Sequence, residues 1–200
     1  MNTSKKKACQ TEYFNPENPD ASRLISSKIS RLLSQEKYNT DDIVVLCIGT
    51  DRATGDALGP ITGSLLTQAC GTCNIYGTLK NPVHALNLRE NIRSIYATHD
   101  SPTVIAIDAS LGNHSDVGLI TLSSAPLYPG IGVNKKLPAI GDISITGIVN
   151  LSGKPGLSLL QSTRLYTVST MATCIARSLL NIITSRSTCR YTNSLLCTPR

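Results

Sequence analysis

The chain has 200 residues, of which 40% are apolar and 4% aromatic, and its net charge is +6. This length suits one domain with an aliphatic core better than two domains. No apolar run reaches the roughly 18 residues of a membrane span, and the N-terminus lacks the apolar stretch of a signal peptide. We therefore expect a cytoplasmic protein that contacts no membrane, with its seven cysteines reduced.

The positive charge gathers mainly at the two ends of the chain. Residues 1–19 hold three lysines and two glutamates, and residues 185–200 hold three arginines and no acid. Neither end interleaves these charges with the aromatic residues that bind nucleic acids. The composition favours a disordered N-terminal lead over residues 1–19 and a basic, frayed tail over residues 185–200, and it disfavours nucleic acid as a partner.

Between these ends, apolar periodicity predicts helices that alternate with strands. The predicted helices cover residues 20–35, 60–70, 81–99 and 157–184, and the predicted strands cover residues 42–49, 74–79, 103–110, 117–124 and 142–151. The runs at 42–49 and 103–110 are almost wholly apolar, as is typical of strands buried on both faces of a parallel sheet. The pattern predicts one α/β domain over residues 20–184, with a mostly parallel sheet and a long Gly/Pro-rich loop over 125–141.

Acids follow two of the predicted buried strands. The stretch "IVVLCIGTDRATGDALGP" leads into Asp51 and Asp56, and "VIAIDAS" contains Asp108. Ligands bind at the carboxyl ends of parallel strands, and a buried acid is costly unless it is used or paired. Two close carboxylates do not both ionise easily, so one can act as base and the other as acid toward a water that attacks a carbonyl. Alternatively, Asp56 caps the helix beginning near Pro60, or both acids hold a metal with a histidine.

Other motifs carry less information. The glycine patterns lack the spacing of a dinucleotide turn or a P-loop. Cys70 and Cys73 stand at a predicted helix end, which indicates incidental thiols and not a thioredoxin-like site. The histidines have no metal-binding spacing; His84 is placed near a helix start, and His99 near a helix end where it would favour the helix dipole.

Five blocks in order between about residues 43 and 176 resemble the YyaC-type sporulation proteins of spore-forming Firmicutes. The blocks are "CIGTDRATGDALGP", "YGTLKNPVHALNL", "VIAIDASLG", "PLYPGIGVNKKLPAIGDISITGIVN" and "LQSTRL". That family is similar to the germination protease of spores and, more distantly, to the hydrogenase maturation peptidases, which share a three-layer α/β fold of the phosphorylase/hydrolase type. The resemblance implies a peptidase of the sporulating cell or forespore, with protein substrates such as small acid-soluble spore proteins.

Carried over by position, the resemblance implies that Asp56 and Asp108 are the two catalytic acids. The maturation peptidases bind nickel with a further histidine, whose position falls on Ala139 in this chain, so neither a metal nor another cofactor is expected. Supporting or substrate-binding roles are expected for Thr50, Asp51, Arg52, Asn134, Lys135 and Arg164. For Arg164 a plain salt bridge on its helix is an equal alternative to pairing with a carboxylate near the site.

Three hypotheses remain open at this point. The first is an endopeptidase of sporulation or germination in which the two aspartates activate water. The second is a non-catalytic peptide-binding or scaffold protein of the same fold. The third, a nucleic-acid-associated protein acting through its basic ends, predicts a steep salt dependence of binding.

Overall fold

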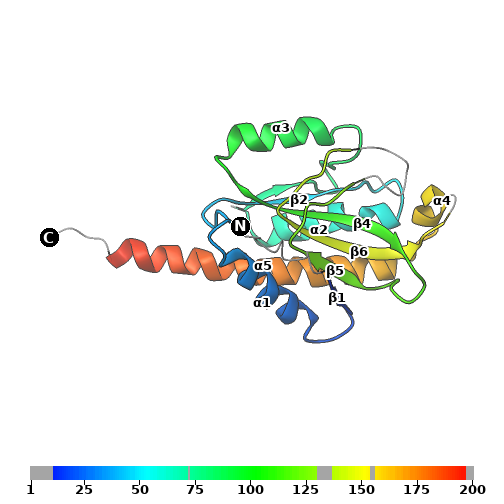
Figure 1. The fold of residues 1–200 in the computed structure, drawn as a ribbon, viewed down its shortest axis with the longest axis horizontal. Coiled ribbons are helices and arrows are strands. Elements are labelled where there is room, and N and C mark those ends of the chain that lie inside the picture. The colour runs from blue at the N-terminus through cyan, green and yellow to red at the C-terminus, as the bar shows by residue number, and fades with distance from the viewer. Residues whose placement is uncertain (1–10, 72, 130–136, 154–155, 197–200) are drawn as a thin grey trace, which may run out of the picture.

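The structure is a computed structural model that describes residues 11–71, 73–129, 137–153 and 156–196. A six-stranded sheet of the order β1-β5-β6-β4-β2-β3 forms its centre (Figure 1). The strands β3, β2, β4 and β6 run parallel, whereas β5 and β1 add an antiparallel edge. The strands are β1 Glu12–Phe14, β2 Ile43–Cys47, β3 Asn74–Tyr76, β4 Thr103–Gly112, β5 Ile120–Ser123 and β6 Ile143–Leu151.

Helices cover both faces of this sheet, so the predicted three-layer α/β fold is confirmed. Figure 1 shows α3 on one face, with α1 and α5 on the other, and α2 packs against α5. The helices are α1 Ala21–Leu33, α2 Leu58–Ala69, α3 Leu88–Thr98, α4 Gly156–Gln161 and α5 Leu165–Leu196, and a 3₁₀ turn, η1 Gly55–Ala57, precedes α2. None of the helices in the described part of the chain has the length and apolarity needed to span a membrane.

The alternation of side chains along β2 explains how one strand serves two cores. Val44 and Leu46 belong to the core under α3, whereas Val45 and Cys47 belong to the core that α1, α2 and α5 share. Because successive side chains of a strand point to opposite faces, the continuous apolar run buries both faces at once.

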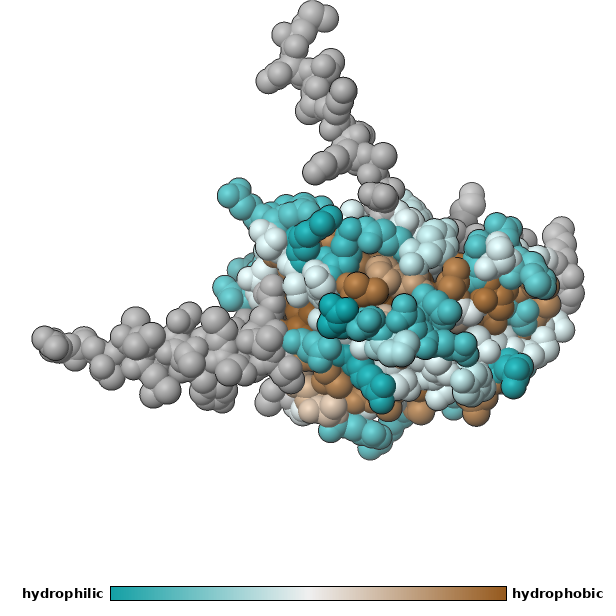
Figure 2. All heavy atoms as spheres, turned by 90° about the horizontal axis from the view of Figure 1, so that it is seen from below, coloured by the Kyte–Doolittle hydropathy of each residue, from teal (hydrophilic) through white to brown (hydrophobic). Residues whose placement is uncertain are grey.

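Polar residues predominate on the outer surface on the α1 and α5 side, with apolar residues visible between them (Figure 2).

The connections between strands create a crevice at one edge of the sheet. The chain leaves β2 through α2 to reach β3 on one side, and it then crosses through α3 to β4 on the other side of β2. The two crossover helices lie on opposite faces, so the segments that lead into them diverge at the carboxyl ends of β2 and β3, next to the carboxyl half of β4. This is where ligands bind in open α/β sheets.

The predicted ends of the domain are wrong in two places. The lead is not disordered throughout, because Glu12–Phe14 form β1 and pair with Ile120–Leu122 of β5; this is a long-range contact without a local sequence signal. The last helix was expected to end near residue 184 before a frayed tail, but α5 continues to Leu196. No glycine or proline interrupts the sequence between these points.

Three local predictions from the sequence also differ from the structure. The helix predicted for residues 81–99 begins only at Leu88, and the one predicted for 157–184 is divided into α4 and α5. Cys70 and Cys73 form a disulfide, so the expectation of reduced, incidental thiols is wrong for this pair. The turn after α2 brings their Cα atoms to 5.8 Å, which is the usual separation for a disulfide.

Candidate active site

Backbone hydrogen bonds join the segments that follow β2 and β3 to each other and to the middle of β4, which runs on to Gly112 and contains Asp108. They bring the loop after β2, which carries Asp56, beside the segments that carry His84 and Asp108. The bonds run from Ile48 N–H to the Ile107 carbonyl (2.7 Å), from Gly49 N–H to the Val83 carbonyl (2.8 Å) and from Thr50 N–H to the Asp56 carbonyl (3.1 Å). Three segments far apart in sequence therefore meet at the carboxyl edge of the sheet.

Two glycines allow this close approach. Gly49 has a φ of +138°, and a Cβ added there would collide with the carbonyl oxygen of Asp56. A Cβ at Gly59 would collide with the carbonyl oxygen of Ile48. The glycines of "IGTDRATGDALGP" therefore serve to fold the loop back onto the end of β2, which fixes the position of Asp56.

A cavity of about 340 Å³ opens at this edge. Its apolar walls are Ile48, Ala53, Ala85, Pro129, Leu137 and Leu160. Its polar side chains are Thr50, Arg52, Asp56, His84, Asp108 and Gln161. A mostly apolar pocket with a few convergent polar groups is the usual form of a small active site.

Asp108 is the more deeply buried of the two acids, with 8% of its surface exposed. Burial raises the pKa of its carboxyl well above the usual range, and the charge of Asp56 raises it further. The Ala109 N–H, which donates a hydrogen bond of 2.8 Å to Asp108 Oδ1, opposes this shift in pKa. Asp108 is therefore the group that keeps its proton after Asp56 has ionised.

Asp56 is partly buried, and its surroundings both raise and lower the pKa of its carboxyl. Burial raises the pKa of its carboxyl, whereas the Thr50 amide and the charge of His84 lower it. Asp56 does not cap α2, because Ala57 holds the N-cap position and makes no side-chain capping bond. The carboxylate of Asp56 thus faces the cavity without a structural capping role.

His84 is one of two polar cavity residues, the other being Gln161, that the sequence analysis did not assign to the site. It lies in a turn before α3 and not in the helix, and Asn87 holds this turn by accepting from the His84 N–H (2.8 Å) and donating to the Pro82 carbonyl (3.0 Å). His84 Nδ1 accepts a hydrogen bond from the Leu86 N–H (3.3 Å), so in the neutral ring Nε2 carries the proton. The position of His84 after a parallel strand was the available signal.

The loop residues predicted to support the acids are only partly in the cavity wall. Thr50 and Arg52 line the cavity, whereas Asp51 is exposed and does not. The Thr50 hydroxyl donates to Asp51 Oδ1 (3.5 Å) and accepts from the Arg52 N–H (3.4 Å). Asp51 therefore contacts the loop and not the cavity.

The remaining predicted residues lie elsewhere. Arg164 is exposed, with its guanidinium 6.0 Å from the centre of the Tyr166 ring, and it forms no ion pair with any described carboxylate. Asn134 and Lys135 lie outside the described residues. The structure therefore brings together Asp56, Asp108, Thr50 and Arg52 from the predicted set and adds His84 and Gln161.

The donor atoms of the described residues around the cavity are not arranged to hold a metal ion. Over the described ranges, no group of three or more His, Cys, Asp or Glu side chains is arranged to hold one. Ala139, where the sequence resemblance places the histidine of the maturation peptidases, is exposed and supplies no ligand side chain. We therefore derive no step through a metal.

Comparisons with known proteins agree with this architecture. The family model described as "Protein of unknown function (DUF1256)" matches residues 14–178. The protein of Bacillus subtilis (strain 168) called "Uncharacterized protein YyaC" is 44% identical over 169 residues, which are 84% of this chain and 82% of that protein. A solved structure, the NiFe hydrogenase maturation protease HycI from Thermococcus kodakarensis KOD1, shares the fold with a TM-score of 0.52 at 15% identity, over 78% of this chain and 99% of its own. The resemblance to YyaC-type proteins is thus confirmed, and the chain belongs to the DUF1256 family.

Proposed function

We propose that this protein is a peptidase in which Asp56 and Asp108 activate a water molecule against a peptide bond. The observation that carries the proposal is the coupling of the two acids in one cavity, where the charge of Asp56 raises the pKa of the buried Asp108. One acid is thereby kept as a base and the other as a proton donor, the division of roles that hydrolysis requires. The fold shared with a maturation protease supports a polypeptide substrate.

The chemistry needs only groups that line the cavity. The ionised Asp56 takes a proton from water as the water oxygen forms a bond to the carbonyl carbon. His84 donates its Nε2–H to the developing oxyanion, whose negative charge a fixed hydrogen-bond donor stabilises. When the tetrahedral intermediate collapses, the C–N bond breaks and Asp108 gives its proton to the amine nitrogen. The proton on Asp56 then returns to Asp108, which restores the pair.

The apolar walls of the cavity support this division of roles. Ile48, Leu137 and Leu160 line the cavity with the acids, whose carboxyls are largely withdrawn from water. In such surroundings a charge interacts more strongly with its neighbours than it does in water. The same burial that raises the pKa of Asp108 therefore strengthens the hydrogen bond from His84 to an oxyanion.

We further propose that the substrates are proteins of the sporulating cell or forespore. The basis for this setting is the resemblance of the five sequence blocks to the YyaC-type sporulation proteins, together with the 44% identity to the Bacillus subtilis protein YyaC. Small acid-soluble spore proteins are the first candidates to test.

The test is to incubate purified small acid-soluble spore proteins with the wild-type protein and with Asp56→Asn, and to follow new termini by mass spectrometry. We expect cleavage by the wild type and a loss of about 100-fold or more in Asp56→Asn, because Asn cannot act as a base. The variant should keep its melting temperature. Asp100→Asn, which changes an exposed acid at the other end of the sheet, is the matched control.

Two results would count against this function. Equal cleavage by wild type and Asp56→Asn would show that Asp56 is not the base. No cleavage of any tested spore protein by the wild type, together with binding of those proteins, would favour the non-catalytic peptide-binding alternative.

A further inference from the structure

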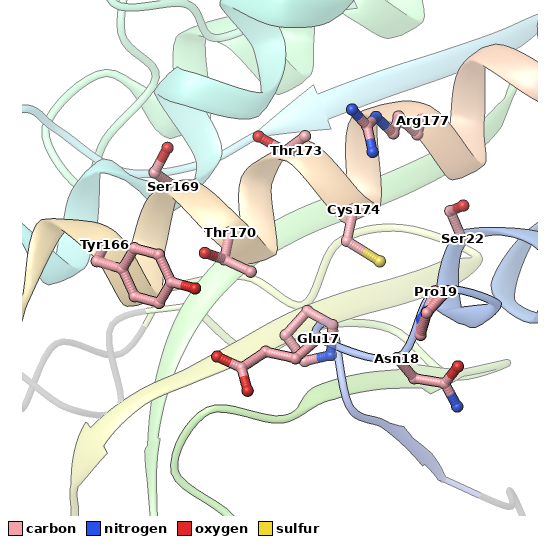
Figure 3. A pocket seen from close by; sticks show the side chains of 11 residues that line it. Glu17, Asn18, Pro19, Ser22, Tyr166, Ser169, Thr170, Thr173, Cys174 and Arg177 are labelled. Atoms are coloured by element: carbon pink, nitrogen blue, oxygen red, sulfur yellow. The ribbon is translucent and has the colours of Figure 1, made fainter.

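A second hollow, of about 400 Å³, lies between α5 and the segment that joins β1 to α1. We call it the α5 groove. One wall consists of Tyr166, Ser169, Thr170, Thr173, Cys174 and Arg177, and the other of Pro16, Glu17, Asn18, Pro19 and Ser22. Figure 3 shows Tyr166, Thr170 and Cys174 projecting from α5 toward the segment that carries Glu17.

The hydroxyl groups of the α5 groove lack the hydrogen bond to the preceding helical turn that several other helical hydroxyls of this chain make. Thr62, Ser64, Thr67 and Ser178 each donate to the carbonyl four residues earlier, at 2.7 to 2.9 Å. Ser169, Thr170 and Thr173 make no such bond, and neither they nor the Tyr166 hydroxyl bonds to another described side chain or carbonyl. Each of these groups can both donate and accept, so together they can match the alternating N–H and C=O groups of an extended peptide.

The groove also offers one cation that is free of ion pairs. Arg177 is exposed and forms no salt bridge within the described part of the chain. Its charge acts on Cys174 in the groove wall, where it opposes the rise in thiol pKa that burial causes. Arg177 and Tyr166 are eleven positions apart, close to three turns of helix, so they lie on one face about 16 Å from each other. Glu17 stands on the opposite wall and disfavours a second acid beside it.

A short turn connects the α5 groove to the catalytic cavity. Gln161 lines the cavity and Tyr166 lines the groove, and five residues of chain span at most about 18 Å. Between them Leu165 and Tyr166 are exposed by 60% and 62%, and Arg164 lies over the Tyr166 ring. Exposed Tyr and Arg side chains are frequent anchors at protein interfaces.

We propose that the α5 groove binds an extended, acidic stretch of the polypeptide substrate. The stretch enters the groove at Tyr166 about five or six residues from the bond that is cut in the cavity, and its acidic residue reaches Arg177 about five residues further on. The proposal rests on the peptidase function proposed above. Arg177 takes the acidic side chain, and the free hydroxyls of α5 take the peptide backbone. The groove thus selects which polypeptides reach Asp56 and Asp108.

The experiment measures peptide binding in the absence of cleavage. Two fluorescein-labelled, end-blocked peptides, four repeats of Gly-Ser-Asp and four repeats of Gly-Ser-Asn, are titrated with the full-length Asp56→Asn protein, and fluorescence anisotropy is recorded. We expect the Asp peptide to bind about five-fold more tightly than the Asn peptide. Adding Arg177→Ala should remove this difference, whereas Arg177→Lys should retain part of it. Arg93→Ala, an exposed arginine of α3 on the other face of the sheet, is the matched control.

Equal affinity for the two peptides, unchanged binding in Arg177→Ala, or no binding up to about 1 mM would overturn the proposal. Because the protein used has no catalytic carboxylate at position 56, these results do not depend on cleavage. If the wild type cleaves spore proteins but neither peptide binds, only the groove proposal fails. If the Asp peptide binds through Arg177 but nothing is cleaved, the peptidase proposal fails and peptide binding by the groove stands.

Discussion

The two ends of the sheet each place a histidine near an aspartate, yet the two pairs differ in their partners. At the amino end, His99 Nδ1 lies 2.9 Å from Asp42 Oδ1 and 3.0 Å from Oδ2. His99 Nε2 lies 3.1 Å from the Tyr76 hydroxyl, and Asn74 Nδ2 donates to Asp42 Oδ1 at 3.1 Å. The carboxylate of Asp42 and both ring nitrogens of His99 thus have partners, and the cluster ties α3 and β3 to the start of β2.

At the carboxyl end, Asp56, His84 and Asp108 line a cavity and form no ion pair within the described ranges. The pKa values of both acids are raised, chiefly by burial. The comparison teaches that closeness of an acid and a histidine does not define a site in this protein. What sets the proposed site apart is that its acids are desolvated and line a cavity instead of pairing with other side chains.

Replacing the two histidines is the strongest test of this distinction. We expect His84→Ala to reduce kcat/KM on a cleaved spore protein by about 100-fold, because it removes the proposed oxyanion donor. His84→Gln should recover part of the activity through its amide donor. His99→Ala should lower the melting temperature and leave kcat almost unchanged. Similar kcat/KM values for His84→Ala and His99→Ala would show that the two ends of the sheet do not differ in function.

Two glycine substitutions test whether the close backbone approach at the carboxyl end leaves no room for a side chain. Gly49→Ala should lower the free energy of unfolding by about 3 kcal/mol or more, because a positive φ is combined with a collision with the Asp56 carbonyl. Gly118 also has a positive φ but no neighbour within 4 Å of an added Cβ, so Gly118→Ala should cost only about 1 kcal/mol. Urea denaturation of both variants measures the difference, and equal losses would contradict the close approach.

The paired cluster at the amino end should act on stability alone. Asp42→Asn removes the charge that His99 and Asn74 contact, and we expect the free energy of unfolding to fall by about 1 to 3 kcal/mol. Asp100→Asn alters an exposed acid nearby and should change it by less than about 0.5 kcal/mol. Thermal melts of both variants and an activity assay provide the check. A loss of activity in Asp42→Asn without a loss of stability would assign the amino end a functional role.

The smallest effect concerns the pH dependence of stability. The pKa of Asp108 in the folded protein lies above its usual value of 3.8, so its protonation favours the fold. This contribution is complete below the usual pKa and is lost as pH rises toward the raised one. Asp108→Asn, which stays neutral, should therefore gain about 1 kcal/mol or more at pH 7, a gain that disappears near pH 3.5. An equal difference at both pH values would show that Asp108 is not desolvated as described.

The sequence predicted the central sheet well because its signal is local. The apolar runs at 42–49 and 103–110 could only be strands buried on both faces, and parallel pairing then placed Asp56 and Asp108 at one edge. His84 was missed because residues 81–87 continue a helical pattern, and only the long-range pairing of Val83 with Ile48 makes them a turn. β1 was missed for the same reason, since three residues become a strand only when β5 is beside them.

The position of α5 in the fold sets the order in which the domain can form during synthesis. α5 packs against both α1 and α2, so the apolar faces that carry Ile25 and Leu66 stay uncovered until it has been made. About 130 residues separate the end of α1 from the start of α5, which corresponds to roughly 7 to 26 s of translation. The larger core therefore closes only after α5 has left the ribosome, and the apolar faces of α1 and α2 remain exposed to other nascent chains until then.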